Sequence, residues 1–405
     1  MKFDYYPVGT KDYDLSSVAG TQLAKYIATD WFPGVPTSAV NGFADIICSV
    51  LNVEGYDSYW CVNPDLAVTD KQWKAATSWI LGVAFTRFVI EKEGYPWWSP
   101  VSAFEAQRTG GTTKTGEWLP RLPRSQFRIE KCKSSTSRLL PDYIVCRITP
   151  NGQYEYAIVE SKGTKDNIAR WDTAPKKWSD QARNAELFFR DKQQTVSRNL
   201  VVATRVNPSA TRSRSRRIAV RVWNSNTMEQ STDDVMFAAF LAVHYAGICW
   251  RLGFDKLADA MEEAGEEIVS EYTLAERYHT RPSLRTESSK PKDARRQLIQ
   301  GAFDHLQTLD ENQSLMVLRT EPPRSRAVVR GRIFEAGLTQ VALNIMQSIS
   351  DMTLSEIKHT ASQAVAHAQT WASYYADHHN EFFGVTANGV AVFDVERSES
   401  AVRRE

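Results

Sequence analysis

The sequence predicts an α/β protein in which helices sandwich a mixed sheet, followed by a mainly helical C-terminal region. Element patterns between residues 75 and 225 run helix, three strands, helix and two strands. Long helical periodicity starts near residue 233. The composition, with 42% apolar and 24% charged residues, is typical of a globular protein with a sizeable core.

Length, charge and cysteine content limit the classes of function. A chain of 405 residues holds one large domain or two to three ordinary ones. The net charge is +1, so a nucleic-acid surface has to come from local segregation of charge. The five cysteines are isolated, which favours a reducing compartment and excludes a disulfide framework or zinc knuckle. The N-terminus has no apolar signal core, and the apolar stretch 235–250 is short for a membrane span, so we expect a cytoplasmic protein without a membrane partner.

Residues 1–70 are expected to form an N-terminal helical region, with short amphipathic helices over 20–32 and 38–53. A longer helix is predicted over 70–93, because its apolar side chains recur at helical spacing. The sequence GYPWWSP, residues 94–100, ends that helix, since its prolines and glycine cannot continue the hydrogen-bond ladder.

The middle of the chain, residues 71–228, carries the predicted sheet. Its elements are strands over 127–132, 142–148 and 154–161, a helix over 174–190 with Pro175 in its first turn, and strands over 199–206 and 217–224. The turn sequence PNG joins the second and third strands into a hairpin.

Residues 229–405 are expected to be a mainly helical partner or regulatory region that ends in a small hairpin. Helical patterns cover 233–268, 292–307, 331–350 and 353–380, a polar linker covers 281–296, and Asn388-Gly389 is the turn of a hairpin over 382–395.

Three ionisable residues interrupt the apolar strands. In AIVESKG, the strand period of two places Glu160 and Lys162 on one face and Ser161 on the other. Asp142 begins the neighbouring strand, so pairing of the two strands brings three ionisable groups together. The two carboxylates repel each other unless a proton or cation lies between them. Magnesium fits this role because it prefers carboxylate and carbonyl oxygens, and the lysine could then orient or deprotonate a water.

Pro141-Asp142 followed by Glu160-Ser161-Lys162, in the order strand, strand, helix, strand, resembles the PD-(D/E)XK superfamily of nucleases with the restriction-endonuclease-like fold. The resemblance implies metal-dependent phosphodiester hydrolysis. It implies that Asp142, Glu160 and the backbone carbonyl of Ser161 bind Mg²⁺, with Mn²⁺ as an alternative, and that Lys162 serves the attacking water.

Many members also place a glutamine or lysine on the following helix, where this chain has Lys177 and Gln181, and Gln181 is the better match. Some branches have a tyrosine four residues after that glutamine, but Ala185 stands here, which argues against those branches. A further acid often precedes the strands. Glu105 is the preferred candidate, and Glu91 and Glu93 are the alternatives.

Simpler interpretations of these residues stay open. Asp142 could cap a turn after Pro141, and Glu160 and Lys162 could form a surface ion pair at a solvated strand end. The fold could also be catalytically silent and serve as a nucleic-acid-binding scaffold. In a third interpretation the helical half is the functional part, as an interaction module.

Local charge suggests where a nucleic acid would bind. No acid occurs between Asp191 and Glu229, and the loop over 207–217 is its most basic part. The candidate phosphate contacts are Arg212, Arg214, Arg216 and Arg217, together with Lys177. Trp97 and Trp98 are expected to be buried rather than to stack on bases.

The sequence therefore predicts a magnesium-dependent DNA endonuclease, with RNA as a possible substrate. Its architecture is similar to that of a bacterial restriction or anti-phage defence effector. Cutting both strands with one site per chain favours a homodimer or a partner within a defence complex.

Overall fold

The computed structural model describes residues 2–8, 14–17, 50–54, 59–104, 111–112, 118–119, 127–133, 139–209, 216–224, 230–277, 289–310, 315–319, 326–329, 332–377 and 383–394. One large hydrophobic cluster extends from Phe3 to Val392 and joins residues from both halves of the chain. The predicted helix over 20–32, and residues 38–49 of the predicted helix over 38–53, lie outside the described residues. The end of the second prediction is wrong, because residues 51–54 form a strand.

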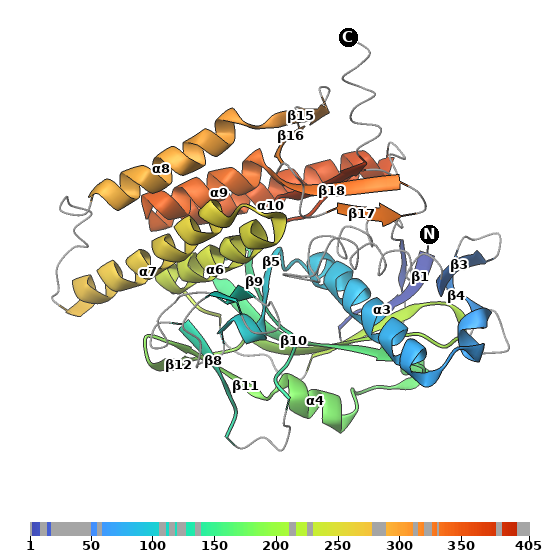
Figure 1. Cartoon of the computed structure of the whole chain (residues 1–405). Helices are drawn as coiled ribbons and strands as arrows, with labels where there is room; N and C mark the ends of the chain where they lie inside the picture. Colours follow the sequence, from blue (N-terminus) through green and yellow to red (C-terminus); the bar gives the residue numbers. More distant parts are fainter. Residues whose placement is uncertain are drawn as a thin grey trace, which may run out of the picture.

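The main sheet is mixed and nine-stranded (Figure 1). Its strands, in spatial order, are β3 (Leu51–Glu54), β4 (Tyr59–Val62), β1 (Lys2–Tyr6), β14 (Ala219–Asn224), β13 (Arg198–Arg205), β10 (Tyr154–Thr164), β9 (Tyr143–Ile148) and β5 (Trp97–Pro100), with β2 (Asp14–Ser17) on β1. Strand β9 is antiparallel to both of its neighbours, β5 and β10, and β10 is parallel to β13. This mixed sheet with helices confirms the predicted α/β class.

The long helix α3 (Lys71–Lys92) lies directly on β10. It begins at the N-cap Asp70, whose side chain accepts hydrogen bonds from the backbone N–H groups of Gln72 and Trp73. A Cβ atom added to Gly163 of β10 would lie 1.9 Å from the carbonyl oxygen of Ser78 in α3. Glycine is therefore required where the helix and strand backbones meet.

The short helix α4 (Lys176–Ala182) contacts β10 and β13 from the side opposite α3. It follows the turn η3 (Ile168–Arg170) in the connection between these two parallel strands. The predicted helix over 174–190 is wrong beyond Ala182, because residues 185–189 form β11 (Ala185–Phe189). The alternating burial of β11 matches the period of a strand, and pairing with neighbouring strands overrides the helical pattern.

The strand predicted over 127–132 is present as β8 (Phe127–Lys131), but it is not part of the main sheet. It pairs with β11 in a three-stranded sheet completed by β12 (Lys192–Gln194). The position beside β9 is taken by β5, which includes the tryptophan pair that was predicted only to end a helix. Trp97 and Trp98 are 0% and 6% exposed, so their predicted burial is confirmed.

The C-terminal region contains more strand than predicted. Helices α6 (Asp234–Leu252), α7 (Asp255–Arg277), α8 (Ser289–Asp304), α9 (Gln340–Asp351) and α10 (Leu354–Asp377) accompany a six-stranded sheet of β15 (Gln307–Asp310), β16 (Leu315–Leu318), β17 (Arg326–Val329), β18 (Arg332–Thr339), β19 (Phe383–Val385) and β20 (Val390–Asp394). The helix predicted over 331–350 is wrong before residue 340, where β18 pairs with β16, β17 and β20. The terminal hairpin is confirmed as β19–β20, with Gly389 at a φ of 84°.

Figure 1 shows α6 to α10 grouped above the main sheet, with α4 below it. Helix α6 is the one helix in the described ranges long and apolar enough to cross a membrane, and 89% of that stretch is buried inside the protein.

Candidate active site

The site lies where β9 begins, beside the part of β10 that extends past it. The antiparallel ladder between these strands stops at the pair Tyr143 and Val159. Asp142, immediately before β9, supplies the next acceptor: its Oδ2 accepts a hydrogen bond of 2.7 Å from the backbone N–H of Ser161. The start of β9 thus fixes the Asp142 carboxylate beside the Glu160-Ser161-Lys162 segment.

Glu160 and Lys162 project from the same side of β10. The Lys162 ammonium forms an ion pair with Oε1 of Glu160. Oε2 of Glu160 is buried and has no hydrogen-bond partner within the described part of the chain. The Glu160 side chain is fully buried whereas that of Lys162 is 24% exposed, so the ammonium marks the side from which solvent reaches the site.

Burial and charge make the two carboxylates hard to ionise together. Burial, the largest cause, and the charge of Asp142 together raise the pKa of Glu160 to about 8, although the Lys162 ammonium opposes the shift. Burial also raises the pKa of Asp142, against the opposing effects of the Ser161 N–H and of Lys162. A cation beside both carboxylates would relieve this conflict.

Helix α4 contributes the side-chain amide of Gln181 to the site. Lys162 Nζ donates to Oε1 of Gln181 at 3.1 Å, and Nε2 of Gln181 donates to the carbonyl of Leu140 at 3.2 Å. Asn184, immediately after α4, donates to the carbonyl of Leu139 at 2.7 Å. Gln181 therefore reaches Lys162 and also helps hold the segment that leads into Asp142.

Sequence reasoning missed Asn184 and Thr86. Asn184 is fully buried, and its position between a helix and an apolar strand is the only local signal for it. Thr86 of α3 lies on the other side of β10, with its Oγ1 2.9 Å from Oγ of Ser161. No local pattern marks Thr86, because its partner is 75 residues away in the chain.

Of the candidate preceding acids, the two that the structure describes have partners away from this site. Glu105 lies outside the described residues. Glu91 accepts a 3.1 Å hydrogen bond from the backbone N–H of Ala387, and Glu93 accepts one from the Tyr5 hydroxyl.

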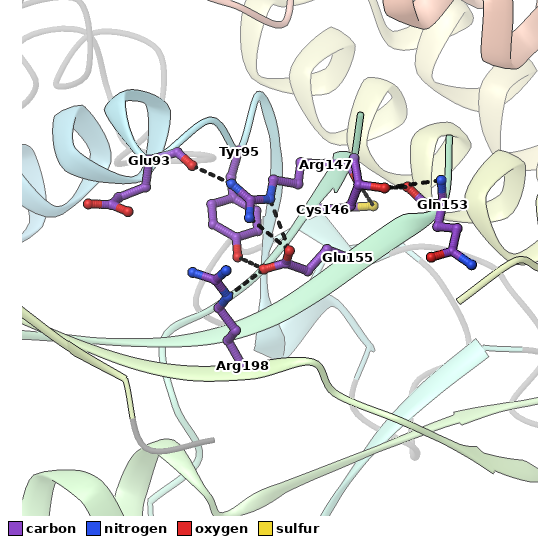
Figure 2. Close-up of polar contacts among 8 residues, drawn as sticks. Glu93, Tyr95, Cys146, Arg147, Gln153, Glu155 and Arg198 are labelled. Carbon is purple, nitrogen blue, oxygen red and sulfur yellow. Dashed lines mark hydrogen bonds and ion pairs between the residues drawn. The ribbon is translucent and has the colours of Figure 1, made fainter. Parts of the chain in front are cut away.

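A second polar cluster ties down the other end of β10 (Figure 2). The buried Glu155 carboxylate accepts a hydrogen bond from the Tyr95 hydroxyl and forms ion pairs with Arg147 at 2.8 Å and Arg198 at 2.7 Å. Arg147 also donates to the carbonyl of Glu93, just after α3, at 2.9 Å. Burial and the Glu155 carboxylate raise the pKa of Tyr95, so Tyr95 remains a donor. This cluster fixes the β9–β10 hairpin against the end of α3.

The basic run after Asp191 is only partly available to a ligand. Arg205 donates to the carbonyl of Arg217 at 2.9 Å, and Arg221 donates to that of Ala169 at 2.9 Å, so both support the fold. The guanidinium of Arg217 lies over the Tyr59 ring. Arg216 is half-buried, and Arg212 and Arg214 lie outside the described residues.

Lys177 is exposed on α4, four residues before Gln181, and so lies on the helix that reaches the site. Among the candidate phosphate contacts that the structure describes, Lys177 is the one on the same helix as Gln181, which bonds to Lys162.

Within the described ranges, no group of three or more histidine, cysteine, aspartate or glutamate side chains gathers as a metal site. The arrangement here has two carboxylates and a lysine. Comparison of the chain with protein-family models, curated proteins and solved structures gave no match.

Proposed function

We propose that the protein is a metal-dependent endonuclease that hydrolyses phosphodiester bonds in DNA. The observation that carries the proposal is the convergence of Asp142, Glu160 and Lys162 at the start of β9, joined by Gln181 from α4. The order of the strand that begins just after Asp142, the strand with Glu-x-Lys, the helix and the parallel strand also supports the resemblance to PD-(D/E)XK nucleases.

The donor set fits Mg²⁺ or Mn²⁺. Asp142, Glu160 and the backbone carbonyl of Ser161 would supply hard oxygen ligands, and Oε2 of Glu160 is a buried acceptor without a partner in the described structure. When bound, the ion would polarise the phosphate and make water a better nucleophile. Its charge would also offset the repulsion that raises the pKa of Glu160.

The chain's own residues then have distinct roles. Lys162 is held between Glu160 and Gln181 and is partly exposed, so its ammonium can orient a water and stabilise negative charge on a phosphate. Gln181 fixes the direction of that ammonium. Lys177, and Arg216 at the edge of the basic loop, are the proposed contacts to the DNA backbone.

We further propose that the C-terminal region is the partner or regulatory part of a cytoplasmic defence effector, acting as a homodimer or with a partner. The alternative is a silent nucleic-acid-binding scaffold. The ion pair between Glu160 and Lys162 favours this scaffold alternative, because the Lys162 ammonium can take the place of a metal ion beside Glu160.

The test is cleavage of plasmid and linear DNA by the full-length protein, with Mg²⁺ or Mn²⁺ against EDTA. We expect metal-dependent cutting that is lost in Asp142→Ala and Lys162→Ala, by a factor of at least about 100. Lys165→Ala is the matched control, because Lys165 is exposed just after β10, and it should cut as wild type does. Wild-type protein that binds DNA, but neither cuts it nor binds the metal, would support the scaffold instead.

A further inference from the structure

Ser161 is held from two sides at the centre of the proposed metal site. Its backbone N–H donates to Asp142 at 2.7 Å, and its hydroxyl lies 2.9 Å from the Thr86 hydroxyl. Thr86 is 0% exposed and Ser161 is 8% exposed, so water does not substitute for either partner. The orientation of the Ser161 peptide therefore depends on α3 as well as on β9.

Helix α3 is fixed along β10 at two further positions. The Ser78 carbonyl leaves no room for a side chain at Gly163, and a Cβ atom at Gly82 would lie 2.8 Å from the backbone nitrogen of Gly163. Beyond the end of α3, Arg147 links the Glu93 carbonyl to Glu155. The helix can neither slide nor rotate on the strand without breaking these contacts.

We propose that Thr86 is a positioning residue of the metal site, acting through the Ser161 hydroxyl to set the direction of the Ser161 carbonyl. The inference rests on the proposed function, in which that carbonyl is a metal ligand. The α3 face that contacts β10 offers a carbonyl at Ser78, bare backbone at Gly82 and a hydroxyl at Thr86. The helix would thus contribute to the site by orienting a ligand and not by donating one.

The chain contains a matched control on the same helix. Thr77 is also 0% exposed, but its Oγ1 makes no hydrogen bond to any residue that the structure describes. Thr77→Val and Thr86→Val therefore make the same chemical change in one helix, and only the second removes a hydrogen bond to the site.

The experiment measures Mn²⁺ binding to the full-length protein by calorimetry, without DNA, in wild type, Thr86→Val, Thr86→Ser and Thr77→Val. Thermal unfolding confirms that each variant is folded. We expect Thr86→Val to bind Mn²⁺ about tenfold more weakly. Thr86→Ser restores the hydroxyl and should recover the affinity, and Thr77→Val should bind as wild type does. In cleavage assays, Thr86→Val should raise the metal concentration for half-maximal rate and leave the KM for DNA unchanged.

A double-mutant cycle with Ser161→Ala tests the route of the effect. If Thr86 acts through Ser161, adding Thr86→Val to Ser161→Ala weakens binding no further. Wild-type Mn²⁺ affinity in Thr86→Val, or equal weakening in Thr77→Val, would overturn the inference while leaving the proposed nuclease intact. Wild-type protein that binds no Mn²⁺ would instead overturn the proposed function, and the inference with it.

Discussion

Glu160 combines complete burial, a neighbouring carboxylate and an oxygen without a partner in the described structure. A residue placed for stability alone would not be left in this state, because an apolar side chain or an amide there avoids the cost of ionisation. The burial of Glu160 beside a second carboxylate is explained if a cation completes the site, since residues placed for function commonly reduce stability.

This argument predicts how Glu160→Gln changes the free energy of unfolding. The pKa of Glu160 is raised from 4.5 to about 8 in the folded protein, so the folded state binds more protons than the unfolded state across that range. Wild-type stability therefore falls as pH rises from about 4.5 to 8. In EDTA, the stability of Glu160→Gln relative to wild type should rise over this window, by on the order of 4 kcal/mol.

Urea unfolding at several pH values measures this difference. Mg²⁺ should stabilise wild type at pH 8 but not Glu160→Gln, because the variant loses a ligand. Glu186→Gln, which changes a partly exposed glutamate of β11, is the control and should show neither effect. A variant less stable than wild type at pH 8 in EDTA would mean that Glu160 is satisfied by Lys162 alone.

Single residues also show how far the sequence could predict the site. Asp142, Glu160 and Lys162 could be singled out because they interrupt apolar strands and follow a known spacing. Thr86 and Asn184 could not, since each contributes through one contact with a residue distant in the chain, at Ser161 and Leu139. Arg205 and Arg221 each donate to a backbone carbonyl, and no sequence pattern predicts such a contact.

At the scale of helices and strands, the predicted element was wrong where a segment fitted both a helix and a strand and pairing with neighbouring strands decided between them. The segments of β11 and β18 both have apolar spacing compatible with a helix, and both are strands because neighbouring strands supply hydrogen bonds. The helix over 70–93 and the β9–β10 hairpin were predictable, because a cap, a turn and a long period agree. The contact between α3 and β10 explains why two glycines lie in those elements.

Alanine substitutions at two glycines, one in α8 and one in β10, should change the stability of the protein in opposite directions. A Cβ atom at Gly301 of α8 would have no heavy atom of the described structure within 4 Å. Gly301→Ala should therefore stabilise the protein by about 0.5–1 kcal/mol, because alanine loses less backbone entropy in a helix. Gly163→Ala should destabilise it by at least about 2 kcal/mol, since its methyl group would overlap the Ser78 carbonyl.

Thermal and urea unfolding of both variants provide the measurement. A Gly301→Ala variant less stable than wild type would show that α8 contacts something at this position. A neutral Gly163→Ala would show that α3 does not sit against β10, and would remove the basis for the positioning role of Thr86.

On the scale of the whole molecule, the proposed nuclease core and the C-terminal region share one interior. Phe237 of α6 stacks on Tyr154 of β10 with ring centroids 4.3 Å apart. His244 of α6 is fully buried, contacts the backbone of Trp98 in β5, and lies 3.3 Å from the amide nitrogen of Asn388 in the β19–β20 turn. The two His244 contacts join residues more than 140 positions apart in the chain, so we expect both regions to unfold together.

His244 makes the contact between α6, β5 and the β19–β20 turn, which we call the joint, sensitive to acid. Burial, the largest cause, and the nearby Arg251 and Arg87 together lower its pKa from 6.5 to about 3, although its bond to the Trp98 backbone opposes the shift. Between these values the unfolded state binds a proton that the folded state does not, so stability falls as pH falls from about 6.5 toward 3. The His244 contribution lost by pH 5 is about 2 kcal/mol.

His244→Gln keeps a polar side chain at the joint but cannot titrate, so its stability should fall less than that of wild type between pH 7 and pH 5, by about 2 kcal/mol. His305→Gln, at an exposed position following α8, should keep the wild-type pH dependence. Urea unfolding should be followed by tryptophan fluorescence and by far-ultraviolet circular dichroism. Fluorescence is weighted toward the first part of the chain, because ten of the twelve tryptophans precede residue 229. Circular dichroism is weighted toward the C-terminal helices. Coincident transitions that shift together with pH would show that His244 couples the two regions. Separate transitions, or equal pH dependence in wild type and His244→Gln, would show that the C-terminal region folds as an independent unit and that this joint does not hold it to the site-bearing sheet.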